Sequence, residues 1–237
     1  MAIDMVLLDR AEQFQQSCLR LYSWEPHCLS FGRHEPAARR YDRDRIAALG
    51  LDTVRRPTGG RAVWHSREIT YAVAAPLRVF GSLQQAYLEI HSTVIDSLRS
   101  LGVPASLAAT TGSVPLDAGA CFAHPVGGEV MVVTRKVVGS AQLNRGSAFL
   151  QHGSILLEDE QQVVTALTVR NAQPPSAAAH GLLSHGHSPP ELIGAISQSA
   201  QARWPGTWNL HSRFGQTIQA ASQYFPHFRS AAWTWER

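Results

Sequence analysis

Residues 51–75 read LDTVRRPTGGRAVWHSREITYAVAA, and this stretch gives the strongest indication of the fold. The segments 51–55, 62–64 and 70–75 are typical of strands, and Pro57, Gly59 and Gly60 mark a turn between the first two. Adjacent glycines allow a ligand to approach the backbone closely, and the arginines around them can meet a carboxylate or a phosphate. Taken alone, a plain hairpin turn is the simpler interpretation.

Helical periodicity surrounds this stretch. The spacing predicts helices over 2–17 and 36–49, and a long helix from Leu83 that Ser82 caps and Gly102 ends. Strands are expected at 19–24, 28–31, 129–134, 136–142 and 149–157, loops at 104–128 and 171–190, and helices near 190–203 and 212–223. Because strands and helices alternate irregularly, we predict an α+β fold, a mixed β-sheet with flanking helices on one side.

Composition limits the class of protein. The 237 residues are 44% hydrophobic with a formal net charge of +3, which fits one large domain without the dense basic stripe of a nucleic-acid binder. Early charged residues interrupt any signal-peptide core, and no stretch approaches the length of a membrane span. Three cysteines without a Cys-x-x-Cys pair indicate a reducing compartment. We therefore expect a cytoplasmic protein with no membrane or nucleic-acid partner.

Lys136 is the only lysine in a chain that has 20 arginines. Its compact ammonium can lower the pKa of a nearby thiol or hold a developing oxyanion, which a planar guanidinium does less well. Cys121 lies fifteen residues earlier in a loop of small residues, whereas Cys18 and Cys28 lie in strand-like runs. A free thiol is roughly 3% thiolate at pH 7, and a pKa about two units lower makes it roughly three-quarters thiolate. Cys121 and Lys136 are thus the candidate catalytic pair.

Two histidines are also candidates. His65 ends the glycine-rich stretch, and His152 lies between Gln151 and Gly153. Either ring can carry a proton or form a pocket wall, although a structural histidine is the commoner outcome for each taken alone.

Together these segments resemble the catalytic domain of biotin and lipoate protein ligases, and most closely the octanoyltransferases of the Gram-positive type in the lipoate pathway. Four blocks carry the resemblance, in the expected order within residues 1–157: Met1 to Asp4, Arg55 to Tyr71, Cys121-Phe122, and Lys136 to Gln142 followed by Leu150 to Ser154. Residues 158–237 match only as a helical tail. We therefore expect a single catalytic domain over 1–237, with a motif-bearing core at 1–157.

The resemblance implies a fold related to the class II aminoacyl-tRNA synthetase core and a narrow acyl tunnel. Octanoyl groups would arrive on acyl carrier protein, form a thioester with Cys121, and pass to a lysine of a lipoyl domain or glycine-cleavage H protein. Lys136 would lower the pKa of Cys121 and contact the acyl carbonyl. Neither ATP, another cofactor nor a metal is implied, and we expect a monomer. The substrate-binding positions implied are Arg56, Gly59, Gly60, Arg61, His65, Gly139, Ser140, Ala141, His152, Gly153 and Ser154.

Two departures accompany the resemblance. Family members usually carry further residues, including a strand, before the first block, so one sheet edge is expected to be incomplete. Ser66 replaces the common aspartate after His65, so any hydrogen bond from that carboxylate is in doubt. An ATP-dependent lipoate ligase, which has no need of Cys121, and a non-catalytic lipoyl-domain binding protein remain alternatives. A biotin ligase is disfavoured because its Gly-Arg-Gly-Arg loop is absent.

Overall fold

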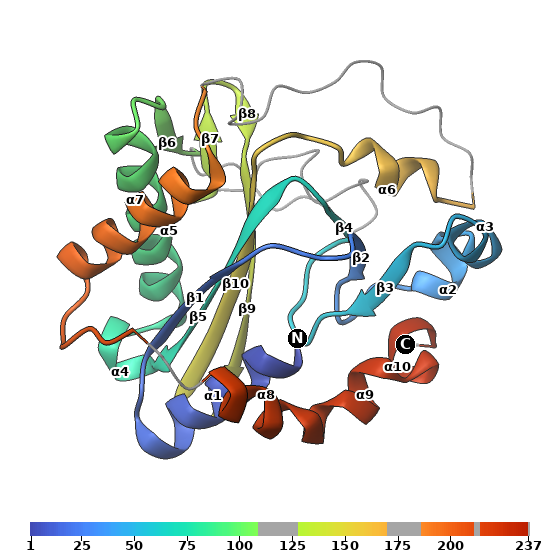
Figure 1. Cartoon of the computed structure of the whole chain (residues 1–237), viewed down its shortest axis with the longest axis horizontal. Coiled ribbons are helices and arrows are strands. Elements are labelled where there is room, and N and C mark those ends of the chain that lie inside the picture. Colours follow the sequence, from blue (N-terminus) through green and yellow to red (C-terminus); the bar gives the residue numbers. More distant parts are fainter. Residues whose placement is uncertain (109–127, 170–185, 211–213, 237) are drawn as a thin grey trace.

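The centre of the molecule is a four-stranded antiparallel sheet in a computed structural model that describes residues 1–108, 128–169, 186–210 and 214–236. Its order is β1 (Cys18–Tyr22), β5 (Glu68–Pro76), β10 (Ala148–Leu156) and β9 (Val138–Arg145). Every residue of β5 and β10 is buried, which agrees with the mostly apolar sequence of β5. Figure 1 shows these strands between the helices on the left and a second sheet on the right.

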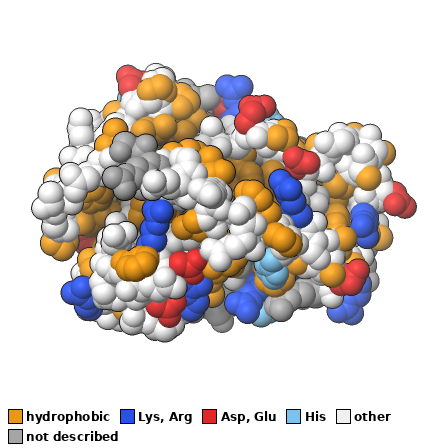
Figure 2. Space-filling view, turned by 60° about the horizontal axis from the view of Figure 1, so that its bottom comes forward, with side chains coloured by type: hydrophobic (Ala, Val, Ile, Leu, Met, Phe, Trp, Pro, Cys, Tyr) orange, Lys and Arg blue, Asp and Glu red, His pale blue; other side chains and the backbone are white. Residues whose placement is uncertain are grey.

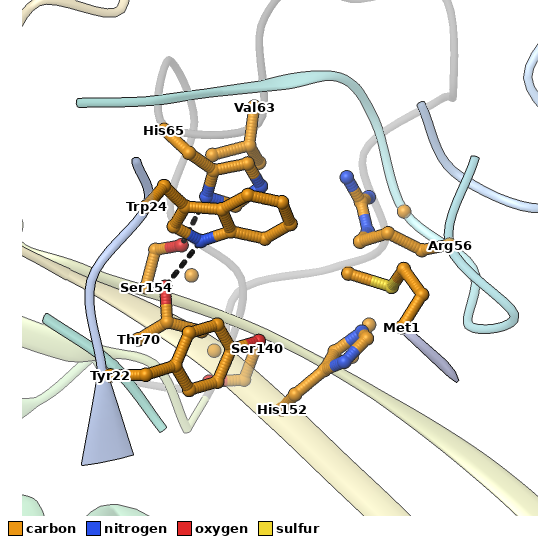
Figure 3. A pocket seen from close by; sticks show the side chains of 14 residues that line it. Met1, Tyr22, Trp24, Arg56, Val63, His65, Thr70, Ser140, His152 and Ser154 are labelled. Carbon is orange, nitrogen blue, oxygen red and sulfur yellow. Dashed lines mark hydrogen bonds between the residues drawn. The ribbon is translucent and has the colours of Figure 1, made fainter. Parts of the chain in front are cut away.

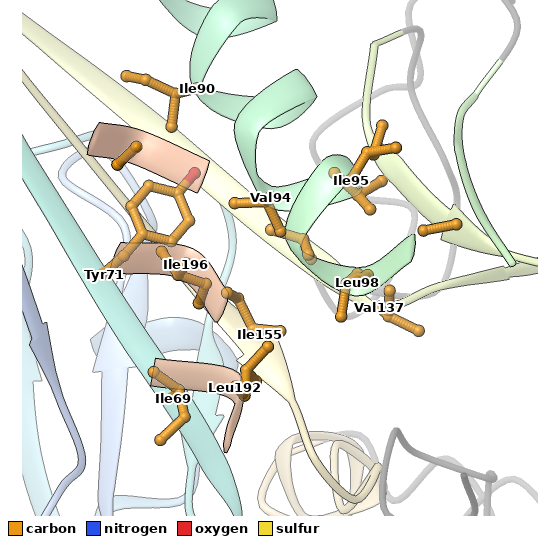
Figure 4. Packing of buried hydrophobic residues seen from close by; sticks show 14 of the residues in the cluster. Ile69, Tyr71, Ile90, Val94, Ile95, Leu98, Val137, Ile155, Leu192 and Ile196 are labelled. Carbon is orange, nitrogen blue, oxygen red and sulfur yellow. The ribbon is translucent and has the colours of Figure 1, made fainter. Parts of the chain in front are cut away.

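Helices cover both faces of this sheet. Ile69, Tyr71 and Val73 of β5 face α5 (Leu83–Ser100) and α7 (Pro189–Arg203), and this cluster forms the main core (Figure 4). The alternate residues, Ala72 and Ala74, face α1 (Ala2–Phe14) on the other side. The α+β class predicted from the sequence is confirmed, but the expectation of helices on one side is wrong. Side chains of a strand alternate between faces, so both buried faces need a cover.

The segment around Gly59 and Gly60 is a connection, and the expected hairpin is wrong. The strand β2 (Cys28–Phe31) lies between β3 (Asp52–Arg55) and β4 (Val63–His65), pairing parallel with the first and antiparallel with the second. Residues 56–62 therefore pass over the end of β2. The N–H of Arg33 donates to the carbonyl of Thr58 at 2.8 Å, and a Cβ on Gly32 would overlap the carbonyl of Gly60.

A small third sheet carries Lys136. It consists of β6 (Ala105–Leu107), β7 (Val130–Val132) and β8 (Arg135–Lys136), in that order and antiparallel. The strand expected at 136–142 thus continues as β9 only from Val138. The main chain passes directly from this sheet into the edge strand of the main sheet, so Lys136 lies close to the edge of the core.

The helices largely follow the sequence. Ser82 caps α5 by accepting a hydrogen bond from the N–H of Gln85, as predicted, whereas α1 ends at Phe14 because Gln15 takes a left-handed conformation. The helix expected over 36–49 is broken into α2 (Ala37–Arg40) and α3 (Arg43–Ala48), because Asp42 caps the second. The remaining helices are α4 (Leu77–Phe80), α6 (Gln162–Ala166), α8 (Phe214–Ala221), the short 3-10 helix Ser222–Tyr224, α9 (Phe225–Arg229) and α10 (Ala231–Trp235).

The C-terminal helix α10 is attached to the second sheet by Arg55, whose side chain is fully buried. Its Nε donates to the carbonyl of Trp233 at 2.8 Å and its Nη2 to that of Thr234 at 2.9 Å. Its Nη1 donates to the carbonyls of Gly32 and Glu35. The indole of Trp233 returns a bond to the carbonyl of Arg55 at 3.0 Å. One side chain thus joins β3, the segment after β2, and the end of the chain.

None of the helices in the described residues is both long and apolar enough to span a membrane. On the face shown in Figure 2, the blue and red side chains are interspersed among apolar and uncharged ones. This distribution agrees with the small formal charge of +3.

Candidate functional site

A small pocket with a cavity volume of about 30 Å³ lies between the main sheet and the second sheet. Figure 3 shows Met1, Arg56 and His152 across from His65, Ser154 and Thr70. The lining residues come from both sheets and from the segments that join them: Met1, Tyr22, Trp24, Arg56, Gly60, Val63, His65, Thr70, Gly139, Ser140, Ala141, His152, Gly153 and Ser154.

Most positions that the resemblance marks for substrate binding lie in this lining. They are Arg56, Gly60, His65, Gly139, Ser140, Ala141, His152, Gly153 and Ser154. Gly59 and Arg61 do not belong to the described lining, although they flank Gly60. A Cβ on Gly59 would meet nothing within 4 Å, so this glycine is not packed against the pocket wall. The four sequence blocks thus converge on one pocket, apart from the segment that carries Cys121.

Arg56 holds the connection between β3 and β4 in place. Its Nη1 donates to the carbonyl of Ser30 at 3.0 Å and to the Ser30 hydroxyl at 2.6 Å. Its Nη2 donates to the carbonyls of Gly59 at 3.2 Å and Arg61 at 2.7 Å. The planar fork of an arginine suits such a set of fixed acceptors better than a lysine would. The geometry makes Arg56 a clamp that shapes the pocket wall.

His65 lies at the centre of a buried hydrogen-bond network. Its Nε2 is 2.6 Å from the Ser30 hydroxyl, and its Nδ1 is 2.7 Å from Oε1 of Glu68. Arg56 can only donate, so Ser30 accepts from it. The Glu68 carboxylate can only accept, so Nδ1 of His65 carries a proton and donates to it. In the neutral ring, Nε2 then accepts from the Ser30 hydroxyl. The order serine, histidine, acid is that of a hydrolytic triad, but Ser30 is fully buried and its oxygen is already bonded.

Glu68 is a site residue that the sequence did not reveal. Besides His65, its Oε1 accepts from the hydroxyls of Thr70 at 2.6 Å and Ser154 at 2.9 Å. Ser66 offers no carboxylate to His65, and Glu68 supplies one instead. One sequence feature could have indicated this role: Glu68 is an acidic residue at the start of an otherwise apolar strand. A buried charge there is unfavourable unless it is hydrogen-bonded.

Aromatic packing closes the same side of the pocket. The indole of Trp24 stacks on His65 with 4.4 Å between ring centroids and 16° between planes. Its Nε1 donates to the Thr70 hydroxyl at 2.9 Å, a bond drawn in Figure 3. The Thr70 and Ser154 protons are directed to Glu68, so both lining hydroxyls already donate to protein atoms. This wall of the pocket consequently suits an apolar chain.

His152 connects the main sheet to the segment over β2. Its Nε2 is 2.6 Å from the Thr58 hydroxyl, and its Nδ1 is 3.6 Å from Oδ2 of Asp4. Burial lowers the pKa of His152 despite the attraction of Asp4, so the ring is neutral near pH 7. Burial alone would raise the pKa of Asp4, but the amino group of Met1, His152 and Arg20 hold that pKa well below its usual range.

A second series of hydrogen bonds joins β5, β9 and α5. Tyr71 and Ser140 share a hydrogen bond of 2.6 Å, and the Ser140 hydroxyl is 2.8 Å from Nε2 of His91. Nδ1 of His91 lies 2.6 Å from the carbonyl of Gly128. A Cβ on Gly153 would come within 2.5 Å of the Ser140 hydroxyl and 2.8 Å of the Tyr71 ring. Gly153 is therefore needed for this chain of bonds, a structural role that its sequence block did not indicate.

The candidate catalytic pair is described only in part. Lys136 is buried, and its Nζ lies 2.6 Å from Oε1 of Glu129. Among the described lining residues of the pocket, Lys136 is absent. Cys121 lies outside the residues that the structure describes. Burial raises the pKa of the Cys18 thiol, and it raises the pKa of the Cys28 thiol to about 12. Both thiols are therefore protonated at neutral pH and poorly nucleophilic.

Solved structures establish the fold class. A bipartite lipoate protein ligase from Thermoplasma acidophilum superposes with a TM-score of 0.76 at 17% identity, covering 99% of this chain and 89% of that one. LipL1 of P. falciparum in complex with lipoate gives 0.76 at 16% identity, covering 100% and 70%. At such low identity the likeness concerns the fold alone, which is that of lipoate protein ligases.

Sequence comparison places the chain within a family. Residues 1–186 match the lipoyl protein ligase A/B catalytic domain, and the chain belongs to this family. It is 38% identical over 162 residues to a protein of Carboxydothermus hydrogenoformans named octanoyltransferase LipM, covering 67% of this chain and 60% of that protein. It is 39% identical over 164 residues to the protein of that name from Moorella thermoacetica, covering 66% and 60%. The chain thus spans about 60% of the length of these curated relatives.

Proposed function

We propose that this chain is an octanoyltransferase of lipoate biosynthesis. It takes an octanoyl group from acyl carrier protein, holds it as a thioester on Cys121, and transfers it to a lysine of a lipoyl domain or glycine-cleavage H protein in the cytoplasm. Several relatives at 35–39% identity carry the name octanoyltransferase, which supports the proposal.

The pocket is the observation that carries the proposal. Several of its polar side chains already bond within the protein: Arg56 to backbone carbonyls, His65 to Ser30 and Glu68, and the hydroxyls of Thr70 and Ser154 to Glu68. A polar ligand would have to compete with these bonds, whereas an alkyl chain needs only the apolar surface. This apolar surface supports the assignment of the marked residues that line the pocket to the binding of an acyl chain.

The chemistry is an exchange of acyl bonds. The Cys121 thiolate attacks the carbonyl carbon of the octanoyl thioester, and the C–S bond to the carrier breaks as the carrier sulfur leaves as a thiolate. The amine of the acceptor lysine then attacks the new thioester, an amide forms, its proton goes to the leaving sulfur, and Cys121 is released. Because the acyl group stays activated as a thioester, the route needs no ATP. Lys136 donates an N–H to the acyl carbonyl as negative charge develops on its oxygen.

One assay compares the three candidate functions. An apo lipoyl domain is incubated with this protein and either octanoyl-acyl carrier protein, free octanoate with ATP, or free octanoate alone, and its mass is measured. We expect the domain to gain one octanoyl group only from the carrier. A gain that requires octanoate and ATP identifies a ligase instead. No gain in any arm, with the domain nevertheless bound, identifies a non-catalytic binding protein.

A further inference from the structure

One oxygen of Glu68 collects hydrogen bonds from three residues that line the pocket, His65, Thr70 and Ser154, which together form its polar wall. Oε1 lies 2.7 Å from Nδ1 of His65, and it accepts from the hydroxyls of Thr70 at 2.6 Å and Ser154 at 2.9 Å. Glu68 itself is only 2% exposed and does not belong to the described lining. The carboxylate therefore lies behind the polar wall, and the donor protons of the wall are directed into the protein.

Strand pairing fixes the carboxylate and the polar wall relative to each other. Glu68 and Thr70 lie two residues apart on β5, so their side chains project from the same face of the main sheet. Ser154 of β10 pairs with Thr70 and projects from that face too. The indole of Trp24 donates to the Thr70 oxygen and stacks on His65 (Figure 3). Turning the Thr70 proton toward a ligand would therefore break its bond to Glu68.

An oxygen atom on a ligand needs a proton donor once it leaves water, because a buried acceptor without a partner is unfavourable. The hydroxyls of the polar wall offer such an oxygen only lone pairs, since their protons are bonded to Glu68. A methylene group has no such requirement. A hydroxyl group on a ligand is an intermediate case, because it can donate its own proton to the Ser154 oxygen.

We propose that Glu68 is a positioning residue that makes the polar wall admit a plain alkyl chain and reject an acyl chain that carries an oxo group. The inference rests on the proposed function for the identity of the ligand as an acyl chain. Glu68 acts through the three residues of the polar wall and does not itself touch the ligand. It determines specificity by holding the protons that an oxo group would need.

The test compares octanoyl-acyl carrier protein with analogues that carry one oxo group at different positions along the chain. Several positions are needed because Tyr22 also lines the pocket, and its hydroxyl has no hydrogen-bond partner among the described residues, so an oxo group near it can be tolerated. For each analogue, kcat/KM is divided by the value for octanoyl. The full chain is measured as wild type, Glu68→Gln and Glu35→Gln. Glu35 is the matched control, a buried carboxylate that accepts from the Tyr41 hydroxyl at 2.6 Å and lies outside the described lining.

We expect wild type to disfavour the oxo analogue whose oxygen faces the polar wall by a factor on the order of ten or more, and to disfavour the corresponding hydroxyl analogue less. Glu68→Gln should reduce this discrimination, because the neutral amide oxygen is a weaker acceptor and the amide brings two further protons. Glu35→Gln should lose stability and keep the wild-type ratio, which separates specificity from a general effect of removing a buried charge.

Equal ratios in wild type and Glu68→Gln overturn the inference, as does a wild type that disfavours none of the oxo analogues. If Glu68→Gln does not fold, Glu68→Asp decides the question, because its shorter side chain cannot reach all three donors and should also lower the discrimination. Calorimetric binding of free octanoate and its oxo analogues separates this inference from the proposed function. A protein that binds with the expected discrimination but transfers no octanoyl group contradicts the proposed function and not the role of Glu68.

Discussion

Gly59 and Gly60 are adjacent in the sequence but differ in conformation and surroundings. Gly60 has a φ of +92°, and a Cβ there would lie 3.3 Å from Nη2 of Arg56. Gly59 lies outside that region of φ and has open space around its Cα. A side chain is therefore strained at position 60 and tolerated at position 59.

We predict that Gly60→Ala costs on the order of 1–2 kcal/mol of stability, whereas Gly59→Ala changes it little. Chemical denaturation of the two variants measures the difference. Because Gly60 also lines the pocket beside the Arg56 clamp, Gly60→Ala should lower octanoyl transfer too. Equal stabilities would mean that the connection over β2 is loose enough to relax, which contradicts the clamp assigned to Arg56.

His91 makes stability depend on pH. Its pKa in the folded protein is about 4, below the ordinary value of 6.5, because burial and the Lys136 charge disfavour the imidazolium. Between these values the unfolded chain binds a proton that the folded chain does not, so stability rises with pH across this window. Acidification from pH 7 to pH 4 should therefore cost on the order of 3 kcal/mol through His91.

The measurement is urea denaturation at a series of pH values for wild type and His91→Gln. We expect the variant to be less stable near pH 7, since the bonds to Ser140 and Gly128 are weakened, but to lose less stability between pH 6.5 and pH 4. Parallel curves for the two proteins would show that His91 is not held neutral by the fold.

The buried polar network around His65 shows what one sequence can and cannot reveal at this scale. His65 and Ser154 were recognised because they lie in distinctive blocks. Ser30 was missed because it reaches His65 only through the pairing of β2 with β4, strands that are far apart in the chain. Glu68 was missed although it lies close to His65 in the sequence, because a single carboxylate does not show which groups it bonds. Local sequence patterns carry no information about such long-range contacts.

At the scale of elements, the strands on either side of residues 56–62 were predicted correctly, but their pairing with each other was wrong. The two runs on either side of Gly59 and Gly60 are strands, as predicted, but β2 inserts between them. Strand periodicity identifies a strand and not its neighbour. The helix over 36–49 was misjudged for a related reason, because Asp42 is both a tolerated helix residue and a good cap.

Arg55 determines how the C-terminal helix α10 attaches. Its guanidinium donates to the carbonyls of Trp233 and Thr234, and these carbonyls would be left without their charged partner in an Arg55→Met variant. We predict a loss of stability on the order of 3 kcal/mol and faster proteolysis near residues 230–236. Arg229→Gln is the matched control, because Arg229 stacks on Phe225 at the surface. If both variants are cleaved at the wild-type rate, α10 is held by its apolar contacts alone.

At the scale of the whole molecule, the sequence was sufficient for the α+β class and for most helices and strands. Residues from three of the four blocks that carry the resemblance line one pocket, and the fourth block, Cys121-Phe122, lies outside the described residues. The sequence did not predict that helices cover both faces of the main sheet, nor did it predict the order of strands in the second sheet. Both depend on which surfaces remain to be buried once the core has formed.

The central claim is that octanoyl transfer proceeds through a thioester on Cys121. The most direct measurement is the intact mass of this protein after exposure to octanoyl-acyl carrier protein without an acceptor domain, before and after treatment with hydroxylamine. The account predicts one hydroxylamine-labile octanoyl adduct on the wild type and on a Cys18→Ala, Cys28→Ala protein, and none on Cys121→Ala. An adduct that persists in Cys121→Ala, or a Cys121→Ala protein that still octanoylates the lipoyl domain, would contradict it.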